Sequence, residues 1–255
     1  MVQRARAEGI PLKVLGDGAN VLVSDDGFDG VVVRLDQPAF RTVRRAGTQI
    51  HVGAGVELMP FSRQCSEQGL SGLEGMAGIP ASVGGAVRMN AGGRFGDFGD
   101  VVDQVEVVRT DGVTEYWDRD RIDFGYRSSA IRDEIITAAR LRLREDDPEQ
   151  ARARFHEYWR VKRESQPMSE NSAGCIFKNP PGHSAGALID RAGLKGTRLG
   201  GAHVSERHAN FIVADRGSKT ADVLRLIDLI RARVAAEFST ELQTEVDIWG
   251  VGTAT

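Results

Sequence analysis

Two glycine-rich segments contain the residues best suited to binding an anion. One is Gly16-Asp17-Gly18-Ala19-Asn20, and the other runs from Gly78 to Val87 and continues into Asn90 and two glycines. Small residues leave backbone N–H groups open to a ligand, and such groups near a helix start form a natural anion site. Neither segment has the Lys-Ser/Thr pair of a P-loop, and the first lacks the third glycine of a dinucleotide fingerprint. The pair favours a pyrophosphate-bearing ligand; tight turns and close helix packing are the ordinary alternative.

Three further side chains could do chemistry on an anionic substrate. The guanidinium of Arg127 can bind a carboxylate through two hydrogen bonds. The Cys175 thiol is a stronger acid than a hydroxyl and can donate a proton. Glu245, placed beside a substrate carboxylate, would tend to hold a proton. From residue types alone, a surface arginine, a small buried cysteine and a solvated strand edge explain them equally well.

Composition excludes several classes of protein. The chain has 255 residues, a net charge of −3 and 27% charged residues, a balance that disfavours nucleic-acid or membrane-surface binding. The two cysteines, Cys65 and Cys175, are too few and too far apart for a disulfide framework, and no CxxC or HxxxH spacing indicates a metal site. Cys65 lies among apolar residues and is predicted to be core. Without a signal peptide or a membrane-length apolar run, we expect a cytoplasmic protein.

Hydrophobic patterning predicts mixed strands and helices. A two-residue hairpin is expected at Asp111-Gly112, where both positions would need a positive φ. The predicted strands are 12–15, 31–35, 49–52, 105–109, 113–117, 134–144 and 245–250, and the predicted helices are 57–68, one from Pro80, 148–164 and one from about 220. Because strands and helices do not alternate regularly, the fold class is α+β. A change to charged, Arg-rich sequence near Pro148 predicts two domains, 1–147 and 148–255.

Several motifs resemble those of the UDP-N-acetylenolpyruvoylglucosamine reductase family. They occur in the family's order over nearly the whole chain. The matching segments are 15–30, 69–80, 172–180, 192–196 and 204–211. The resemblance implies an FAD-binding domain of the vanillyl-alcohol-oxidase type (the PCMH type), followed by a smaller α+β substrate-binding domain. It also implies bound FAD, NADPH as reductant, and reduction of an enolpyruvyl ether of UDP-N-acetylglucosamine to UDP-N-acetylmuramate, a peptidoglycan precursor.

The same resemblance assigns roles to individual residues. Arg127, Cys175 and Glu245 match the catalytic positions, with Cys175 where the family usually has the serine that protonates the α-carbon. Tyr126, Lys178 and Asn179 match substrate-binding positions. Asp247 is acidic where the family is often basic, so no contact is carried over to it. The residues that would hold FAD are Gly16, Asp17, Gly18, Ala19, Asn20, Ile79, Pro80, Ala81, Ser82, Gly84, Gly85 and Ala86.

Two departures and two alternatives accompany this interpretation. The family begins with a further segment that is not seen before Gly16, where Met1–Gly9 instead resembles the end of a helix, so we expect a mis-assigned start. Ala19 replaces the family's usual serine and removes one possible hydrogen bond to the pyrophosphate. The alternatives are another flavin oxidoreductase on the same scaffold, or a non-catalytic flavin- or nucleotide-sugar-binding protein. A monomer is expected, with the UDP-sugar and NADPH as its partners.

Overall fold

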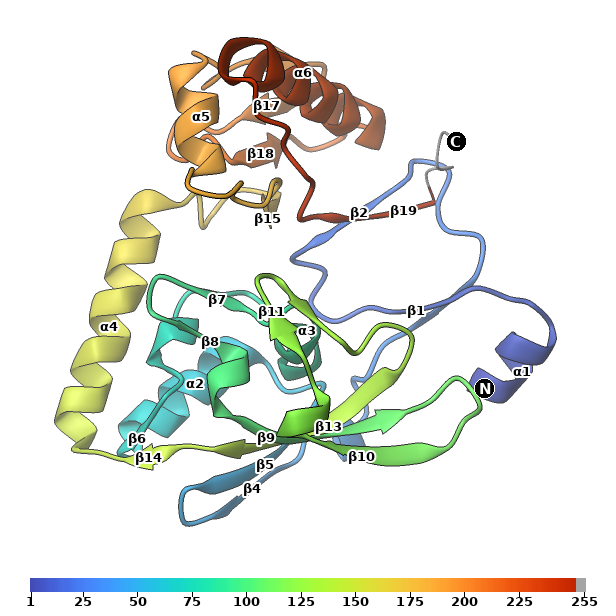
Figure 1. Ribbon diagram of the computed structural model, residues 1–255, viewed down its shortest axis with the longest axis vertical. Coiled ribbons are helices and arrows are strands. Elements are labelled where there is room, and N and C mark those ends of the chain that lie inside the picture. Colours follow the sequence, from blue (N-terminus) through green and yellow to red (C-terminus); the bar gives the residue numbers. More distant parts are fainter. Residues whose placement is uncertain (251–255) are drawn as a thin grey trace. The chain divides into compact units, whose positions relative to one another are not determined.

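The computed structural model of the protein describes residues 1–250, which form two compact units (Figure 1). The first unit combines Met1–Asp17 with Gly30–Lys162, and the second combines Gly18–Asp29 with the residues from Arg163 onward. The expected boundary at residue 147 falls at the start of helix α4 (Pro148–Ser165), most of which belongs to the first unit. Helices and strands are mixed without βα alternation, so the expected α+β class is confirmed.

A five-stranded antiparallel sheet forms the centre of the first unit, in the order β10-β9-β13-β5-β4. Small pairs surround it: β1 with β3 in parallel, and β6 with β14, β7 with β8, and β11 with β12 antiparallel. The strands are β1 (Leu12–Val14), β3 (Val31–Val33), β4 (Val43–Ala46), β5 (Gln49–Gly53), β6 (Leu70–Ser71), β7 (Gly92–Gly93), β8 (Gly96–Asp97), β9 (Val102–Val108), β10 (Thr114–Asp118), β11 (Phe124–Gly125), β12 (Ser128–Ser129), β13 (Ile135–Arg142) and β14 (Arg144–Glu145).

Short helices cover this sheet and bury its apolar face. The α-helices are α1 (Val2–Ala7), α2 (Leu58–Glu67) and α3 (Val83–Arg88), and the 3-10 helices are η1 (Pro38–Phe40), η2 (Glu74–Met76), η3 (Phe98–Val101) and η4 (Arg119–Arg121). Helix α3 packs against β13 and β5. Cys65 on α2 is 3% exposed and burial raises its pKa to about 12, which confirms it as a core residue. The helix predicted from Pro80 begins at Val83, because the Ser82 side chain accepts the Gly85 N–H as an N-cap.

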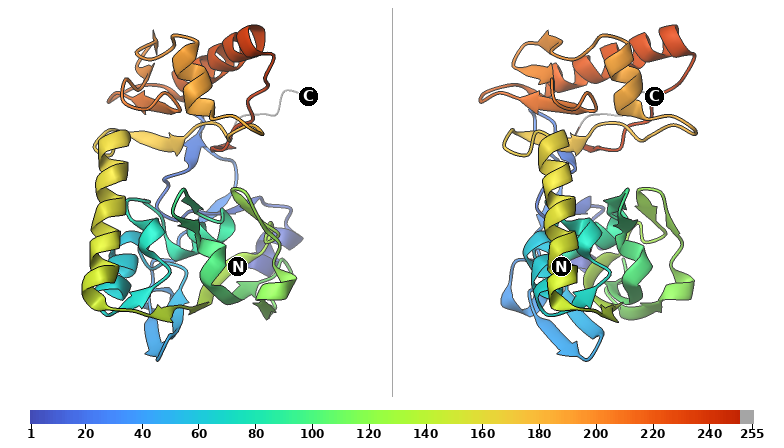
Figure 2. Two further views of the ribbon diagram at one scale, coloured as in Figure 1. Left: turned by 60° about the vertical axis from the view of Figure 1, so that its left-hand side comes forward. Right: turned by 90° about the vertical axis from the view of Figure 1, so that its left-hand side faces the viewer.

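The second unit packs two helices on one antiparallel sheet, in the order β15-β18-β17-β16 (Figure 2). Its elements are β15 (Ser172–Cys175), α5 (Ala185–Arg191), β16 (Arg198–Leu199), β17 (Ala202–Val204), β18 (Phe211–Ala214), α6 (Thr220–Phe238) and the parallel pair β2 (Val21–Val23) with β19 (Asp247–Trp249). The predicted apolar stripe of α6 is buried: Val223, Leu226, Ile227, Ile230 and Val234. Within residues 1–250, no helix is both long and apolar enough to cross a bilayer.

The β9–β10 connection corrects one expectation. The hairpin forms, but only Gly112 has a positive φ, of +81°, and Asp111 does not. Arg109 donates its N–H to the Val113 carbonyl, so the loop contains three residues rather than two. Three-residue hairpin loops need one left-handed residue near their end, and that residue is Gly112.

Helix α4 is attached to the first unit through a buried carboxylate. Glu74, 6% exposed, accepts hydrogen bonds from Nε and Nη2 of Arg154 at 3.1 and 2.8 Å and from the Gly72 N–H at 2.6 Å. Arg154 also pairs with Asp146. Losing one partner of a buried ion pair leaves the other charge without compensation, which is costly. This ion pair therefore links α4 to η2, the segment that leads into the second glycine loop.

We expect Arg154→Met to lower the free energy of unfolding by about 2–4 kcal/mol, because Glu74 would keep its charge in a buried site. Urea denaturation of the full chain measures the change. Arg4→Met is the matched control: Arg4 pairs with Glu8 at 2.8 Å, but both side chains are exposed, so its cost should stay below about 1 kcal/mol. Equal costs for the two variants would contradict the role given to Glu74.

Candidate functional site

The first glycine loop has backbone donors with no partner in the described chain. Leu15 donates its N–H to the Val33 carbonyl at 2.9 Å, beside the β1–β3 pair. Across residues 1–250, no group accepts a hydrogen bond from the N–H groups of Gly16–Asn20. Backbone donors are normally paired, so a run of open N–H groups marks a place for water or an anion. This geometry agrees with the pyrophosphate site expected from the sequence.

The second glycine loop contributes fewer open donors than its sequence indicated. In the described residues the N–H groups of Ala81 and Ser82 have no acceptor, whereas Gly84 donates to the Ala54 carbonyl at 2.8 Å. The N–H groups of Gly85 and Ala86 bond to the side chain and the carbonyl of Ser82. The N–H groups of residues 84–86 are thus all bonded within the protein, so these residues can favour a ligand only through their small size.

The two loops meet inside the first unit at Gly16 and Ser82. A Cβ atom built on Gly16 would lie 2.5 Å from the Ser82 Oγ atom, closer than real Cβ contacts, so this position requires glycine. Next to it, burial and then the neighbouring Glu57 carboxylate raise the pKa of Asp17, against the charges of Arg34 and Arg41.

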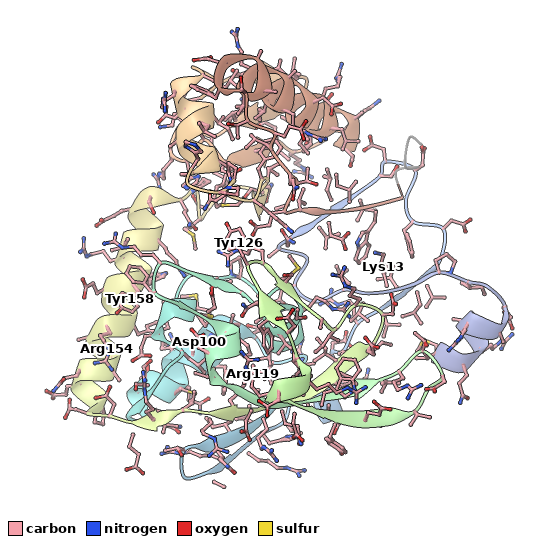
Figure 3. All side chains as sticks on the ribbon, viewed as in Figure 1. Lys13, Asp100, Arg119, Tyr126, Arg154 and Tyr158 are labelled. Atoms are coloured by element: carbon pink, nitrogen blue, oxygen red, sulfur yellow. The ribbon has the colours of Figure 1, made fainter. Side chains whose placement is uncertain are left out.

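Arg127 lies at the tip of the β11–β12 hairpin. Its neighbour Tyr126 is labelled in Figure 3. The φ of Arg127 is +53°, a left-handed conformation that is uncommon for a residue other than glycine. The guanidinium donates from Nη2 to the Gly92 carbonyl at 2.7 Å and lies 3.7 Å from Asp97. Its side chain is 17% exposed, whereas Tyr126 is 50% exposed and lies against the guanidinium, 5.2 Å from ring centroid to Cζ. A largely desolvated guanidinium binds a carboxylate more strongly than an exposed one.

Lys162, on α4, is a residue near Arg127 that sequence reasoning missed. Its ammonium donates to the Gly75 carbonyl at 2.7 Å, and its stem lies 3.3 Å from where a Cβ of Gly78 would be. Burial, and secondarily the charge of Arg127, lower its pKa to about 8. Nothing in its charged helical neighbourhood distinguishes it in the sequence, because its environment comes from residues 75–78.

In the second unit, residues 18–20 at the end of the first glycine loop lie beside the segments that contain Cys175 and Glu245. Asn20 donates from Nδ2 to the Glu245 carbonyl at 3.1 Å, and a Cβ on Gly174 would lie 3.5 Å from the Ala19 carbonyl. The Glu245 N–H bonds to the Ile176 carbonyl at 2.7 Å. Gly174, with φ +72°, occupies an irregularity of β15 directly before Cys175. Residues 18–20, Cys175 and Glu245 are thereby brought together.

The neighbouring predicted residues have structural partners. Lys178 donates its N–H to the Gln243 carbonyl, and the Asn179 Oδ1 atom accepts the Ala185 N–H at 2.9 Å, at the start of α5. Asp247 accepts from the Trp249 indole at 2.7 Å. His208, whose pKa is lowered chiefly by burial, accepts the Asn210 N–H on Nδ1. No cluster of three or more metal-binding side chains occurs among residues 1–250.

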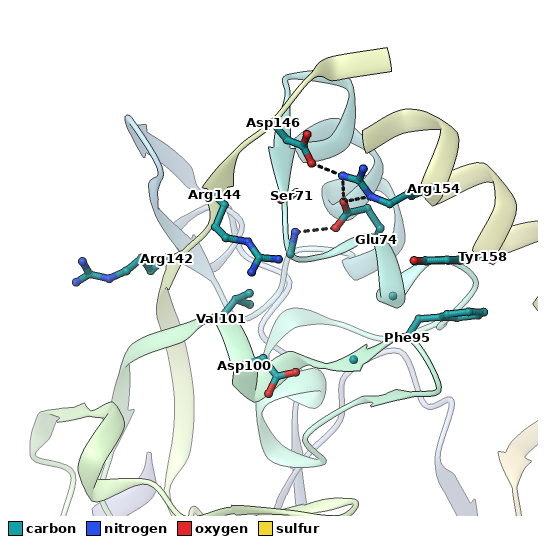
Figure 4. A pocket seen from close by; sticks show the side chains of 13 residues that line it. Ser71, Glu74, Phe95, Asp100, Val101, Arg142, Arg144, Asp146, Arg154 and Tyr158 are labelled. Carbon is teal, nitrogen blue, oxygen red and sulfur yellow. Dashed lines mark hydrogen bonds and ion pairs between the residues drawn. The ribbon is translucent and has the colours of Figure 1, made fainter. Parts of the chain in front are cut away.

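A cavity of about 650 Å³ in the first unit lies elsewhere (Figure 4). Glu74, Arg144, Arg154 and the stacked rings of Phe95 and Tyr158 line it. Its remaining lining residues are Ser71, Gly72, Gly75, Gly96, Asp100, Val101, Arg142 and Asp146. None of the residues predicted to hold cofactor or substrate is among them.

Within the first unit, the open donors of Gly16 and Asp17, with those of Ala81 and Ser82, fit an anion such as the pyrophosphate of FAD. Comparison with known proteins agrees: the sequence model described as "FAD binding domain" matches residues 1–115. The model described as "UDP-N-acetylenolpyruvoylglucosamine reductase, C-terminal domain" matches residues 166–249. The first unit therefore belongs to the class of FAD-binding oxidoreductases.

Individual relatives identify the family. The chain is 44% identical to the UDP-N-acetylenolpyruvoylglucosamine reductase of Heliobacterium modesticaldum, over 98% of this chain and 80% of that protein. It is 46% identical to the enzyme of that name from Thermus thermophilus, over 94% and 87%. The crystal structure of the Thermus caldophilus reductase superposes with a TM-score of 0.82 at 41% identity, covering 96% of this chain and 88% of that one. This chain belongs to the UDP-N-acetylenolpyruvoylglucosamine reductase family.

The pKa of Lys162 predicts a pH-dependent stability. In the unfolded chain, the Lys162 amine keeps its proton up to its ordinary pKa of 10.5. In the folded protein, it loses the proton above about pH 8. Between these values the unfolded chain binds more protons, so rising pH favours the folded state. Relative to Lys162→Met, the wild-type free energy of unfolding should rise by about 2–3 kcal/mol from pH 8 to 10.5, measured by urea denaturation. Parallel pH profiles for the two proteins would show that Lys162 titrates normally.

Proposed function

We propose that this protein uses FAD and NADPH to reduce the enolpyruvyl ether of UDP-N-acetylglucosamine to UDP-N-acetylmuramate. Family membership supports the reaction. The observation that carries it in this chain is the convergence of residues 18–20 with Cys175 and Glu245, through the 3.1 Å bond from Asn20 to the Glu245 carbonyl. A flavin whose pyrophosphate is bound by the first loop would then lie on the segment that also contacts the backbone of Glu245 and of Gly174, next to Cys175.

Arg127 and Glu245 act on the carboxylate side of the substrate. Bound FAD, once reduced, would supply the hydride that adds to the β-carbon of the enol ether. Negative charge then develops toward the carboxylate, where the Arg127 guanidinium stabilises it through two hydrogen bonds. Glu245, protonated beside this carboxylate, donates a hydrogen bond to the enolate oxygen. The Arg127 guanidinium is already held by its bond to the Gly92 carbonyl, so its stabilisation requires little rearrangement in the transition state.

Cys175 completes the reaction by giving its thiol proton to the α-carbon. The proton leaves sulfur, the new C–H bond forms on one face, and the resulting thiolate regains a proton from solvent. A thiol is acidic enough to do at this position what a hydroxyl does in relatives with serine. Gly174 supports the role because its left-handed backbone, φ +72°, turns the chain directly before Cys175.

The remaining contacts concern the nucleotide part of the substrate. We place Tyr126, Lys178 and Asn179 on the UDP-sugar, with the Lys178 ammonium beside the diphosphate. We further propose a cytoplasmic monomer, since UDP-sugars and NADPH are cytoplasmic metabolites.

The deciding experiment is NADPH oxidation by the FAD-loaded protein, followed at 340 nm under anaerobic conditions. Oxidation should be sustained when the enolpyruvyl nucleotide is present. UDP-N-acetylglucosamine is the matched control, because it lacks the double bond and should allow a single reduction of the bound flavin only. Oxidation that is independent of the enolpyruvyl nucleotide would reject the proposed function.

Substitutions at Cys175 test the proton donor. We expect Cys175→Ser to keep turnover within about tenfold, because a hydroxyl can donate, and Cys175→Ala to lose about 100-fold or more, the usual contribution of a general acid. Flavin reduction by NADPH, measured by stopped flow, should survive both changes. Normal turnover by Cys175→Ala would place the donor elsewhere.

A further inference from the structure

Asn90 ends the helix that begins at the second glycine loop. Helix α3 runs from Val83 to Arg88, and Asn90 follows it with a φ of +43° and 6% exposure. Asparagine tolerates this left-handed conformation better than most residues. The conformation aims its buried side chain away from the helix axis, into the loops of the first unit.

The oxygen and the nitrogen of the Asn90 side-chain amide each make a hydrogen bond to a backbone group of another segment. Oδ1 accepts the Gly99 N–H at 2.8 Å, and Nδ2 donates to the Gly125 carbonyl at 2.9 Å. The fit is close, since a Cβ on Gly99 would lie 2.8 Å from Asn90 Oδ1. Gly125 lies two residues before Arg127, so Asn90 fixes the strand that leads into that arginine.

The hairpin that carries Arg127 depends on such bonds. β11 and β12 contain two residues each, too few for a stable isolated hairpin, and Arg127 itself is left-handed. A second bond comes from the same helix: the Ser129 hydroxyl donates to the Arg88 carbonyl at 3.0 Å. The two ends of the hairpin are thus attached to the C-terminal end of α3, whose N-terminal end adjoins the glycine loop.

We infer that Asn90 is a positioning residue that fixes Arg127 for the substrate carboxylate and couples this position to the glycine-loop helix. The inference rests on the proposed role of Arg127. It predicts a loss restricted to ligands that bear the carboxylate. Damage to the fold in general would instead weaken every ligand.

Two variants test the hydrogen bonds of the Asn90 side-chain amide separately from the positive φ of its backbone. Asn90→Gly keeps the freedom to adopt a positive φ and removes both hydrogen bonds. Asn90→Asp keeps an acceptor for the Gly99 N–H but places an oxygen against the Gly125 carbonyl. Ser129→Ala cuts only the second bond and is expected to have a smaller effect. FAD content and far-UV circular dichroism establish that each variant is folded, and Ser129→Ala carries the test if neither Asn90 variant retains FAD.

The measurement is calorimetric binding of two nucleotides to the oxidised, FAD-loaded protein: UDP-N-acetylglucosamine and its enolpyruvyl ether. We expect Asn90→Gly and Asn90→Asp to bind the ether about tenfold or more weakly than wild type, the scale of one misplaced charge-assisted hydrogen bond. Their affinity for UDP-N-acetylglucosamine and their rate of flavin reduction by NADPH should stay within about twofold of wild type.

Measuring Arg127→Lys in parallel distinguishes a failure of the inference about Asn90 from a failure of the proposed role of Arg127. If Arg127→Lys loses discrimination between the nucleotides while the Asn90 variants keep wild-type discrimination, the inference about Asn90 is overturned and the proposed function stands. Equal weakening of both nucleotides by the Asn90 variants would also overturn it, because Asn90 would then be purely structural. If Arg127→Lys discriminates like wild type, the proposed role of Arg127 fails and the inference falls with it.

Discussion

Backbone N–H groups that the chain does not satisfy are the constraint on which this structure depends. Those of Gly16–Asn20, with Ala81 and Ser82, have no acceptor within residues 1–250. An unmet buried donor costs about 1–3 kcal/mol, so these loops are stable only where water or an anion can reach them. Gly16 packs so closely on Ser82 that a side chain would separate the loops. The surrounding sheet and helices therefore hold these donors open to water or to an anion.

The proposed reactive side chains are positioned mainly through backbone carbonyls. Asn20 binds the Glu245 carbonyl in the second unit, and Asn90 binds the Gly125 carbonyl in the first. Asn210 does the same for Phe177, two residues after Cys175, accepting its N–H at 3.0 Å and donating to its carbonyl at 2.8 Å. These bonds fix the segments that carry Arg127, Cys175 and Glu245 without using a reactive side-chain atom. The side-chain amides of Asn90 and Asn210 are buried and make two such hydrogen bonds each, and fully bonded amides of this kind rigidify their surroundings.

Local sequence patterns predicted the elements whose formation depends mainly on neighbouring residues. The stripe from Val223 to Val234 gave α6 because helical periodicity is set by near neighbours. The turn at Asp111-Gly112 was found, but its type was wrong, since one positive φ suffices for a three-residue loop. Pairing of Val21 with Asp247 was not foreseen, because strands so far apart in the chain leave no periodic signal. That pairing places residues 18–29 in the second unit, which no single boundary at residue 147 could express.

The site residues also divide into those that local sequence patterns indicated and those that gave no local signal. The glycine loops could be proposed as anion sites from their composition, whereas the roles of Arg127, Cys175 and Glu245 were proposed from resemblance to a family. Lys162 and Asn90 had no individual signal, since their importance comes from contacts with Gly75 and with Gly99 and Gly125. Such contacts depend on non-local packing.

Binding of flavins to the deflavinated protein tests the central claim, that the open donors of the glycine loops bind a pyrophosphate. Calorimetry with FAD, FMN and riboflavin compares ligands that share the isoalloxazine ring and carry, respectively, a pyrophosphate with adenosine, one phosphate and no phosphate. We expect FAD to bind at least about 100-fold more tightly than riboflavin, because several charge-assisted hydrogen bonds are lost without the pyrophosphate. Equal affinities for FAD and riboflavin would contradict that claim.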